Sequence, residues 1–572
     1  MKEQKRTAWL ARINKRKTGA LLLAFCMLGS VVGCTSGSEE SAFNSNENPF
    51  YGGSSESSGS LGDYENGSTV GSGSSSDSTT DDYETEDVVS GGSSDSTTDD
   101  YETDEPNLGN TDVPTGSWDD YIGEEEEGAN LPSDLVDDPY RKDGGYAYFY
   151  HHQHSPTTMP IAAWSSPPPD TTTTIGEFTT NQITLENYQK IAEAGFNTVY
   201  GLYETLHGVV DVDKTNVTNA LNYANQTGLV YYVKDTSVRG NLIDYGSSAL
   251  ENYYGWYMNK AAYGGTLMVD EPGVDSFATL AAAQVEWNNS KYAKIKNMYV
   301  NHLPSYASYS QLYYGAGDTS STPPKNYTWA EFVEEYITSV SPVNYSYDFY
   351  PFRGGSAQFS NYYSSLSTAK QKSAAGNIPF WVFCQVGYFN MASTLTYAQT
   401  AIQVSTALAY GAKGIQWFNY WHPLEFSASW ISGCVDHYGV KTMYYPWVQT
   451  INNHVAAVDD VLMQCKNVGV IQVGSSYDTI PSSDLLGSYG ALTSTSGSSG
   501  NALIGCFEYR DTGKYVYYIA SNSYTADASV NLTFNGTYNV RTVKGTTSTD
   551  YANRSSFTVN IPKGDGVLVV VG

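Results

Sequence analysis

The sequence predicts a (β/α)8 barrel, an α/β fold of the TIM-barrel class, followed by an all-β domain, and three patterns carry this prediction. Between residues 141 and 463, short apolar or aromatic runs alternate with segments of helical periodicity, which is typical of βα units around a parallel sheet. Several helical segments end in glycine just before the next run, at Gly195, Gly228 and Gly411, as left-handed helix ends do. From 464 to 572 the helical period gives way to short alternating strands, which predicts a β-sandwich.

Eight strands can be counted in the predicted barrel. They cover 146–151, 197–203, 230–234, 266–270, 296–301, 344–350, 380–385 and 414–420. A doubly wound open sheet would show the same alternation, but no glycine-rich phosphate loop follows the first run. Eight repeats favour a closed barrel.

The N-terminus has the pattern of an export signal. Residues 2–17 are rich in Lys and Arg, and 18–32 form an apolar stretch too short to span a bilayer. The stretch ends in Val31-Val32-Gly33-Cys34, which resembles a bacterial lipobox, where the cysteine carries the lipid. We therefore expect 1–34 to be a signal peptide and the exported protein to be held at the outer face of the cell membrane through Cys34.

Residues 35–140 are predicted to be a disordered linker. They contain 28 acidic residues and no Lys or Arg, so they account for most of the formal net charge of -30. Such a segment buries too little apolar surface to offset its ordering entropy, and like-charge repulsion extends it into a spacer. The acidic balance and the absence of a basic stripe also exclude a nucleic-acid partner.

In barrels of this class the functional side chains lie at the carboxyl ends of the strands. The polar candidates at those positions are His151, Glu204, Asp235, Asp270, Glu271, Asn301, Asp348, Gln385 and Asn419.

Aromatic residues accompany these polar ones. The chain has 49 Tyr and 11 Trp, and sugar rings stack their C-H faces on such side chains. Tyr203, Tyr350, Trp417 and Trp421 are therefore candidates for sugar contacts. The alternative is that these rings fill the core, because about half of the side chains on any strand face the helices.

A family resemblance appears when five segments are taken in order: GGTLMVDEP, KNMYVNHLP, YSYDFYPF, IPFWVFCQVG and ALAYGAKGIQWFNYW. Together they resemble bacterial glycoside-hydrolase barrels that are distantly similar to the β-galactosidase and cellulase superfamily. The resemblance implies that Glu271, at the end of the fourth strand, is the catalytic acid, with Asp270 beside it. The alternative is that both acids cap the next helix.

The second catalytic group is less clear, because Gln385 stands where that superfamily has its nucleophilic Glu. Between Asp348 and Glu425 the sequence has no Asp or Glu. Three alternatives remain open: Asp348, Glu425, or a substrate-assisted reaction in which Asp270 orients an acetamido group, as the resemblance to β-N-acetylhexosaminidases implies.

We therefore expect a surface-anchored glycoside hydrolase that cleaves an extracellular oligo- or polysaccharide. The rival hypothesis is a catalytically inactive carbohydrate-binding lipoprotein, motivated by Gln385. No cofactor is expected. No metal is expected either, because His151 and His152 point in opposite directions on a strand and no carboxylate has ligand spacing.

Overall fold

The computed structural model describes most of the chain beyond residue 156. The described residues are 157–173, 176–178, 180–202, 210–290, 292, 301–304, 312–313, 326–353, 356–387, 394–423, 433–475, 480–510 and 513–572. The predicted signal peptide, the linker and the expected strand 146–151 lie outside these residues. Within the described part, no helix is long and apolar enough to cross a membrane.

Eight parallel strands form one sheet whose neighbours follow the order of the chain. They are β1 (Ile161–Trp164), β4 (Thr198–Tyr200), β5 (Val230–Lys234), β6 (Tyr263–Leu267) continued by β7 (Val269–Asp270), β8 (Asn301–Pro304), β11 (Tyr345–Asp348), β14 (Phe380–Gln385) and β15 (Gly414–Phe418).

The sheet closes on itself at the fourth strand. β6 pairs with β5 at one edge, and β7 pairs with β8 at the other edge. Because only Met268 separates β6 from β7, the two edges are the two halves of one strand. β15 pairs with β1 in the same parallel sense. The predicted eight-stranded barrel is therefore confirmed.

The first strand is a correction to the prediction. The position between β15 and β4 is filled by Ile161–Trp164, and not by 146–151. The run 146–151 is the longer and more aromatic of the two, whereas Ile161–Trp164 is short and is followed by prolines, so the pattern favoured the wrong segment. The side chains that follow the first strand are consequently those of Ser165 and Ser166.

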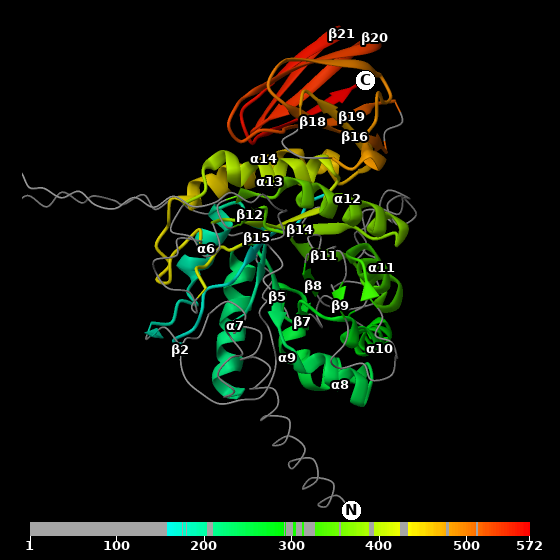
Figure 1. Cartoon of the computed structure of the whole chain (residues 1–572). Coiled ribbons are helices and arrows are strands. Elements are labelled where there is room, and N and C mark those ends of the chain that lie inside the picture. The colour runs from blue at the N-terminus through cyan, green and yellow to red at the C-terminus, as the bar shows by residue number, and fades with distance from the viewer. Residues whose placement is uncertain are drawn as a thin grey trace, which may run out of the picture. The chain divides into compact units, whose positions relative to one another are not determined.

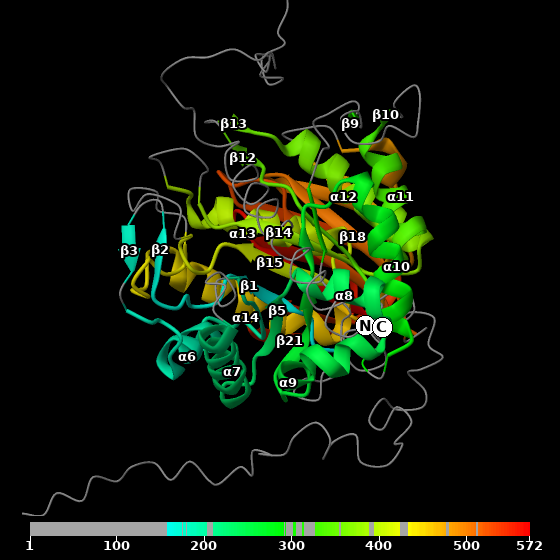
Figure 2. The same cartoon turned by 90° about the horizontal axis from the view of Figure 1, so that it is seen from below.

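Helices surround the barrel between successive strands (Figure 1, Figure 2). They are α6 (Leu185–Glu193), α7 (Val210–Gln226), α8 (Ser237–Tyr245), the π-helix η1 (Leu250–Tyr254), α9 (Gly255–Met258), the 3-10 turn η2 (Val274–Ser276), α10 (Phe277–Asn288), α11 (Trp329–Val340), α12 (Phe359–Ala375), α13 (Tyr397–Ala409) and α14 (Tyr444–Leu462). Gly195, Gly228 and Gly411 have φ values of 78°, 70° and 92°, which confirms the predicted left-handed turns before β4, β5 and the β15 segment.

Strand side chains alternate between the barrel interior and the helical layer. Trp164, Tyr200, Tyr232 and Phe383 belong to a buried cluster inside the barrel. Their sequence neighbours, such as Val199, belong instead to the large core beneath the helices.

A chain of side-chain hydrogen bonds crosses the barrel interior. The Tyr200 hydroxyl donates to Oε1 of Gln416 at 2.5 Å, and Nε2 of Gln416 donates to Oγ of Ser346 at 2.9 Å. All three residues are fully buried, so their hydrogen bonds satisfy polar groups that would otherwise destabilise the core.

The C-terminal domain is an antiparallel sheet with its own apolar core. Its strands are β16 (Cys465–Val473), β17 (Leu492–Ser499), β18 (Ala502–Tyr509), β19 (Tyr515–Ser521), β20 (Ala528–Lys544), β21 (Thr547–Ile561) and β22 (Gly566–Val571), with the turn η3 (Ser482–Asp484). The order is β16-β18-β19-β22-β20-β17, and β21 pairs with β20. β20 pairs with β17 over its first half and with β22 over its second, so one long strand links both parts of the sheet.

The sheet packs on the barrel through α13 and α14. Ser405 donates to the carbonyl oxygen of Gly564 at 2.7 Å, and His454 Nε2 lies 2.9 Å from the Tyr518 hydroxyl. Tyr518 also belongs to the barrel's apolar core.

Three two-stranded hairpins complete the described secondary structure. They are β2 (Thr171–Thr173) with β3 (Gly176–Phe178), β9 (Leu312–Tyr313) with β10 (Asn326–Tyr327), and β12 (Phe352–Arg353) with β13 (Ser356–Ala357).

Candidate active site

Three carboxyl groups lie at the carboxyl ends of the fourth and sixth barrel strands. Asp270 ends β7, Glu271 follows it, and Asp348 ends β11. Asp270 is in register with His302, and His302 with Ser346, two residues before Asp348. With a spacing of about 4.8 Å between strands and about 3.3 Å between residues, the backbones of Glu271 and Asp348 are about 10 Å apart.

Glu271 has an unusual backbone conformation. Its φ of 46° places a non-glycine residue in the left-handed region, which few residues other than glycine adopt. Conformations of this kind cluster at functional sites, where the surrounding structure holds them. The next helix does not begin on either acid, because the residue before η2 is Gly273 and it makes no side-chain capping bond.

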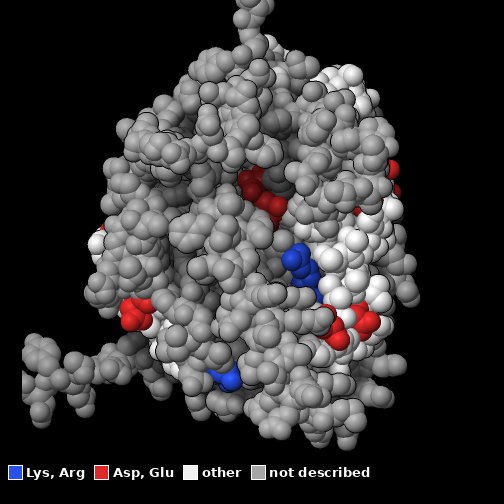
Figure 3. All heavy atoms as spheres, turned by 60° about the horizontal axis from the view of Figure 1, so that its bottom comes forward, with Lys and Arg blue, Asp and Glu red and all other residues white. Residues whose placement is uncertain are grey.

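The three acids differ in exposure. Glu271 is exposed, Asp270 is partly buried, and Asp348 is 7% exposed. Figure 3 shows acidic side chains inside a hollow on one face of the molecule, with basic side chains at its edge. The rim therefore carries one carboxyl group that solvent reaches, Glu271, and one that solvent hardly reaches, Asp348.

Aromatic rings fill the barrel interior next to Asp348. Tyr350, 5% exposed, packs on Phe418 with ring centroids 5.6 Å apart, and both rings contact the interior cluster. Trp164 stands edge-on to Phe383 at 5.5 Å. The structure thus places Tyr350 at the end of the sixth strand, as expected. Trp164 was missed, although its position at the end of an apolar run was a signal for it.

Gln385 has a structural role, which corrects the expectation that it binds substrate. Its Oε1 accepts from the backbone N-H of Phe352 at 2.8 Å, and its Nε2 donates to the carbonyl oxygens of Phe352 at 3.0 Å and Gly387 at 2.8 Å. The side chain is fully buried. A glutamate here could not donate to two carbonyls, so glutamine is the residue that this site requires.

The hydrogen bonding of the Asn419 side chain contrasts with that of Gln385. It follows β15 directly and is fully buried, yet neither its Oδ1 nor its Nδ2 has a hydrogen-bond partner among the residues that the structure describes. Leaving such an amide unpaired costs about 1–3 kcal/mol per group. Unsatisfied buried polar groups in folded proteins call for an explanation, of which a role in binding is one.

Trp417 and Trp421 are core residues, which corrects their expected role in a sugar subsite. Trp417 is fully buried on the outer side of β15, and its Nε1 donates to Oδ1 of Asn452 in α14 at 2.7 Å. Trp421 is 1% exposed in the same core. A Cβ on Gly439 would lie 2.9 Å from its ring, so the loop closes directly over it. The alternation of strand side chains explains Trp417, and a folded loop explains Trp421.

Asp235 lies after the third strand, but its carboxylate is engaged in the start of α8. Oδ1 accepts from the backbone N-H of Ser237 at 3.0 Å and from its hydroxyl at 2.5 Å, and Oδ2 accepts from the Tyr257 hydroxyl at 3.3 Å. Burial raises the pKa of this carboxyl, and the bonds from Ser237 oppose that rise. The expectation of a substrate-binding Asp235 is therefore replaced by a structural role just before α8, whose N-cap residue is Thr236.

Several expected residues cannot be placed. His151, Tyr203, Glu204, Glu425 and Cys34 lie outside the described residues, and the side chain of Asn301 does too. The four described cysteines, Cys384, Cys434, Cys465 and Cys506, are free thiols and buried. Among the residues described, no three His, Cys, Asp or Glu side chains are grouped to hold a metal ion.

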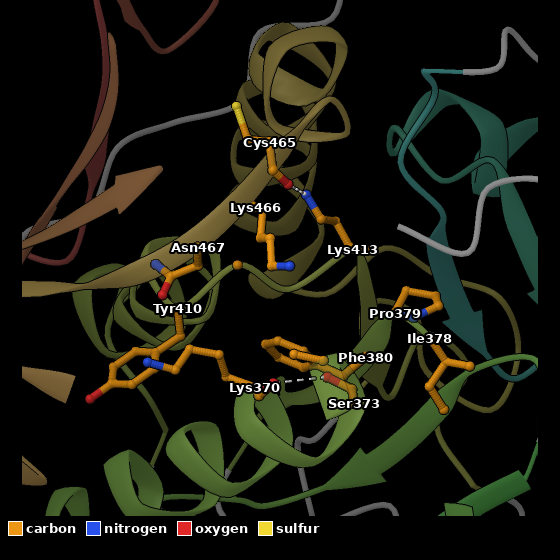
Figure 4. A pocket seen from close by; sticks show the side chains of 12 residues that line it. Lys370, Ser373, Ile378, Pro379, Phe380, Tyr410, Lys413, Cys465, Lys466 and Asn467 are labelled. Atoms are coloured by element: carbon orange, nitrogen blue, oxygen red, sulfur yellow. Dashed lines mark hydrogen bonds between the residues drawn. The ribbon is translucent and has the colours of Figure 1, made fainter. Parts of the chain in front are cut away.

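A small cavity lies away from the strand ends, where α12, α13 and the start of β14 meet β16 (Figure 4). Its volume is about 40 Å3, enough for a few water molecules but not for a sugar ring. Lys413, at its wall, donates through Nζ to the carbonyl oxygens of Leu462 and Cys465, and Lys370 pairs with Asp484 at 2.6 Å. These lysines hold the junction between the barrel and the C-terminal sheet.

The chain matches no known protein-family model and no curated protein. Among solved structures, an α-amylase of Anoxybacillus is 8% identical over 73% of this chain and 99% of its own, with a TM-score of 0.40. A β-L-arabinopyranosidase of Geobacillus stearothermophilus is 8% identical over 75% and 98%, with a TM-score of 0.39. The α-galactosidase of Saccharomyces cerevisiae is 9% identical over 73% and 98%, with a TM-score of 0.39. TM-scores this low assign no activity, and the barrel rests on the strand order and register given above.

Proposed function

We propose that the barrel is a glycoside hydrolase that acts on an extracellular oligo- or polysaccharide, with Glu271 as the general acid. The observation that carries the proposal is the pair formed by Glu271 and Asp348 on one rim of a closed parallel barrel. In this proposal the acidic linker and a lipid on Cys34 hold the enzyme outside the cell.

The reaction needs two carboxyl groups. Glu271 protonates the glycosidic oxygen as the bond to the anomeric carbon breaks. As this bond breaks, Asp348 acts on the opposite face of the sugar in one of two ways. With carboxyl groups about 5 Å apart it attacks the anomeric carbon, and the resulting glycosyl-enzyme is hydrolysed by water that Glu271, now a carboxylate, deprotonates. With carboxyl groups about 6.5–9.5 Å apart it instead takes a proton from a water molecule that attacks the anomeric carbon directly. A substrate-assisted reaction, with Asp270 orienting an acetamido group, is the alternative that the same strand end allows.

The inactive-binder hypothesis loses its main support in this structure. It was motivated by a glutamine in place of a catalytic glutamate, but the Gln385 amide is saturated by backbone groups. The glutamine at this position therefore has a structural explanation, and the proposal takes its second carboxyl group from Asp348. Asn419, buried and unpaired, retains donors and an acceptor for a sugar hydroxyl.

The test compares aryl glycosides that differ in leaving group. We expect Glu271→Gln to lower kcat/KM by about a hundredfold or more for alkyl glycosides. The loss should be much smaller for dinitrophenyl glycosides, because that leaving group departs without protonation. Asp348→Asn should lower both rates alike. Glu334→Gln is the matched control, since Glu334 lies on α11, 60% exposed, in an ion pair with Lys372.

Two results would reject the proposal. Equal rates for the wild type and Glu271→Gln would remove Glu271 from the mechanism. Binding of glycans without hydrolysis of any glycoside in the panel would favour the inactive carbohydrate-binding protein instead.

A further inference from the structure

The helices between the third and fourth barrel strands expose a group of aromatic side chains. Tyr245 is 47% exposed, Tyr253 50% and Trp256 37%. They belong to α8, η1 and α9. Figure 1 shows α8 and α9 at the bottom of the view, on the opposite side of the barrel from the C-terminal sheet. Tyr245 and Tyr253 contact each other, with ring centroids 5.6 Å apart. We call Tyr245, Tyr253 and Trp256 the aromatic platform.

Each exposed ring on η1 and α9 rests on a buried one. Tyr253 stands nearly perpendicular to Tyr254, with centroids 6.3 Å apart, and Trp256 stands perpendicular to Tyr257 at 5.0 Å. Tyr254 is 5% exposed and Tyr257 1%. Such edge-to-face pairs are favourable beyond their buried area, so the exposed rings are held in place.

The buried rings are anchored by the hydrogen bonds around Asp235. The Tyr254 hydroxyl lies 2.9 Å from Oγ of Ser237 and accepts from Asn241, and the Tyr257 hydroxyl donates to Asp235. These bonds fix the two rings on which the platform stands. A preorganised ring loses little conformational entropy when a ligand binds, which is what a binding surface needs.

The π-helix determines which rings are exposed. The single π-turn Leu250–Tyr254 leads directly into α9, with Tyr253 exposed and Tyr254 buried. π-turns within helices are rare and frequent at functional sites.

The chemistry and size of the surface favour a carbohydrate. The three rings, each between a third and a half exposed, present roughly 300 Å2, well below the about 800 Å2 per partner that a stable dimer needs. Asp244 and Glu251 are exposed on the same segment, which disfavours an anionic membrane surface. Flat rings with hydroxyl edges suit the C-H faces and hydroxyls of a sugar, and Lys214 lies 5.7 Å from the Trp256 ring centroid and adds a hydrogen-bond donor.

We propose that the aromatic platform is a second carbohydrate-binding surface, which holds a polymeric substrate outside the catalytic rim. This inference rests on the proposed glycosidase function and adds that the substrate is a polysaccharide rather than a short oligosaccharide. The platform acts by binding alone, so its loss leaves the chemical step unchanged.

The experiment uses the full chain and a panel of insoluble polysaccharides: cellulose, xylan, mannan, chitin and starch granules. Bound protein is measured by depletion for the wild type, for Tyr253→Ala with Trp256→Ala, and for Tyr438→Ala as the control. Tyr438 is a 68% exposed tyrosine on another loop. We expect the double variant to lose at least tenfold in affinity for the polymer that the wild type binds, and the control to bind as the wild type does.

A second readout separates this inference from the proposed function. Hydrolysis of a short aryl glycoside should be the same in the double variant and the wild type, whereas Glu271→Gln should lose hydrolysis and keep binding to the polymer. Unchanged polymer binding in the double variant, or no polymer binding by the wild type, would overturn the inference. A wild-type dimer that the double variant dissociates in sedimentation would overturn it in favour of a second copy of the chain.

Discussion

Two buried asparagines lie on either side of the eighth barrel strand and differ completely in their hydrogen bonding. Asn452, in α14, accepts from Trp417 Nε1 at 2.7 Å and donates to the carbonyl oxygen of Ala194 at 2.9 Å. Asn419, at the carboxyl end of β15, has a partner for neither amide atom. Both side chains are 0% exposed. Burial alone therefore does not distinguish a structural residue from a candidate functional one.

The same contrast separates two parts of the barrel. We call the surrounding helices, with the strand residues that bond to them, the shell, and the rim at the carboxyl ends of the strands the mouth. In the shell, the Gln403 side chain and the backbone of Gln385 bond each other in both directions, and Lys413 donates to two carbonyl oxygens. At the mouth, Glu271 is held in a left-handed conformation and Asn419 is unpaired. These paired groups of the shell contribute stability, whereas the left-handed Glu271 and the unpaired Asn419 cost stability, as expected where function rather than folding selects the residue. The division is not complete, because the indole N-H of Trp287 in α10 is also buried without a partner among the described residues.

The asparagine pair gives the largest expected difference in stability. Asn452→Ala should lower the free energy of unfolding by about 3 kcal/mol, because it leaves a buried N-H and a buried carbonyl without partners. Asn419→Ala should change it by less than about 1 kcal/mol, since no hydrogen bond is lost. Urea unfolding measures both, and equal losses in the two variants would contradict the contrast.

Gln385→Glu tests whether the Gln385 side chain stabilises the fold. We expect this variant to lose about 2 kcal/mol of stability at neutral pH, because a carboxylate would face the carbonyl oxygens of Phe352 and Gly387 with nothing to donate. Burial and these carbonyls would raise the folded-state pKa of the new carboxyl. The loss should therefore shrink as the pH falls and the group is protonated.

The control for this variant is hydrolytic activity. If Gln385 stood in for a catalytic nucleophile, Gln385→Glu would gain glycosidase activity. A gain in kcat together with unchanged stability would return Gln385 to the catalytic site.

Much of the fold could be predicted from the sequence, because a barrel repeats the same pattern of an apolar run, a helical segment and a turn. The third and seventh strands were predicted with the bounds that the structure has, since each is a short apolar run between clear turn residues. The first strand was not, because Ile161–Trp164 has only four residues and a stronger run precedes it. Closure depends on the pairing of β6 and β7 with different neighbours, which no local pattern encodes.

The sequence predicts where the candidate site lies, but not which of its side chains are bonded to other parts of the fold. Strand ends identify Glu271, Asp348 and Asn419 as rim residues, whatever their partners. Whether the side chain of a rim residue is hydrogen-bonded within the fold depends on residues far away in the sequence. The backbone N-H of Phe352 donates to Gln385, and the Tyr257 hydroxyl donates to Asp235. Trp417 likewise faces Asn452 across 35 positions of the chain. The aromatic platform was missed because exposure and the π-turn are properties of the folded chain.

The smallest expected effect concerns the pH dependence of stability, which we assign to the shell. Asp459 in α14 accepts from the backbone N-H of Met159 at 3.0 Å, two residues before β1, and burial raises its pKa to about 7. Because the folded-state pKa is raised, the folded protein binds more protons than the unfolded chain between about pH 4 and 7, and stability falls as the pH rises through that range.

Asp459→Asn should remove this contribution and keep an acceptor for Met159. Between pH 4 and 8 we expect the wild type to lose on the order of 1–2 kcal/mol more than the variant, after allowance for solvent screening. Thermal or urea unfolding of both proteins across that range measures the difference, in which the contributions of Asp235 and Asp565, whose pKa values burial also raises, cancel. Identical slopes would mean that Asp459 is ionised in the folded protein. A changed pH profile of hydrolysis in Asp459→Asn would instead contradict the separation of shell and mouth, because it would couple a residue of α14 to the acids at the carboxyl ends of the strands.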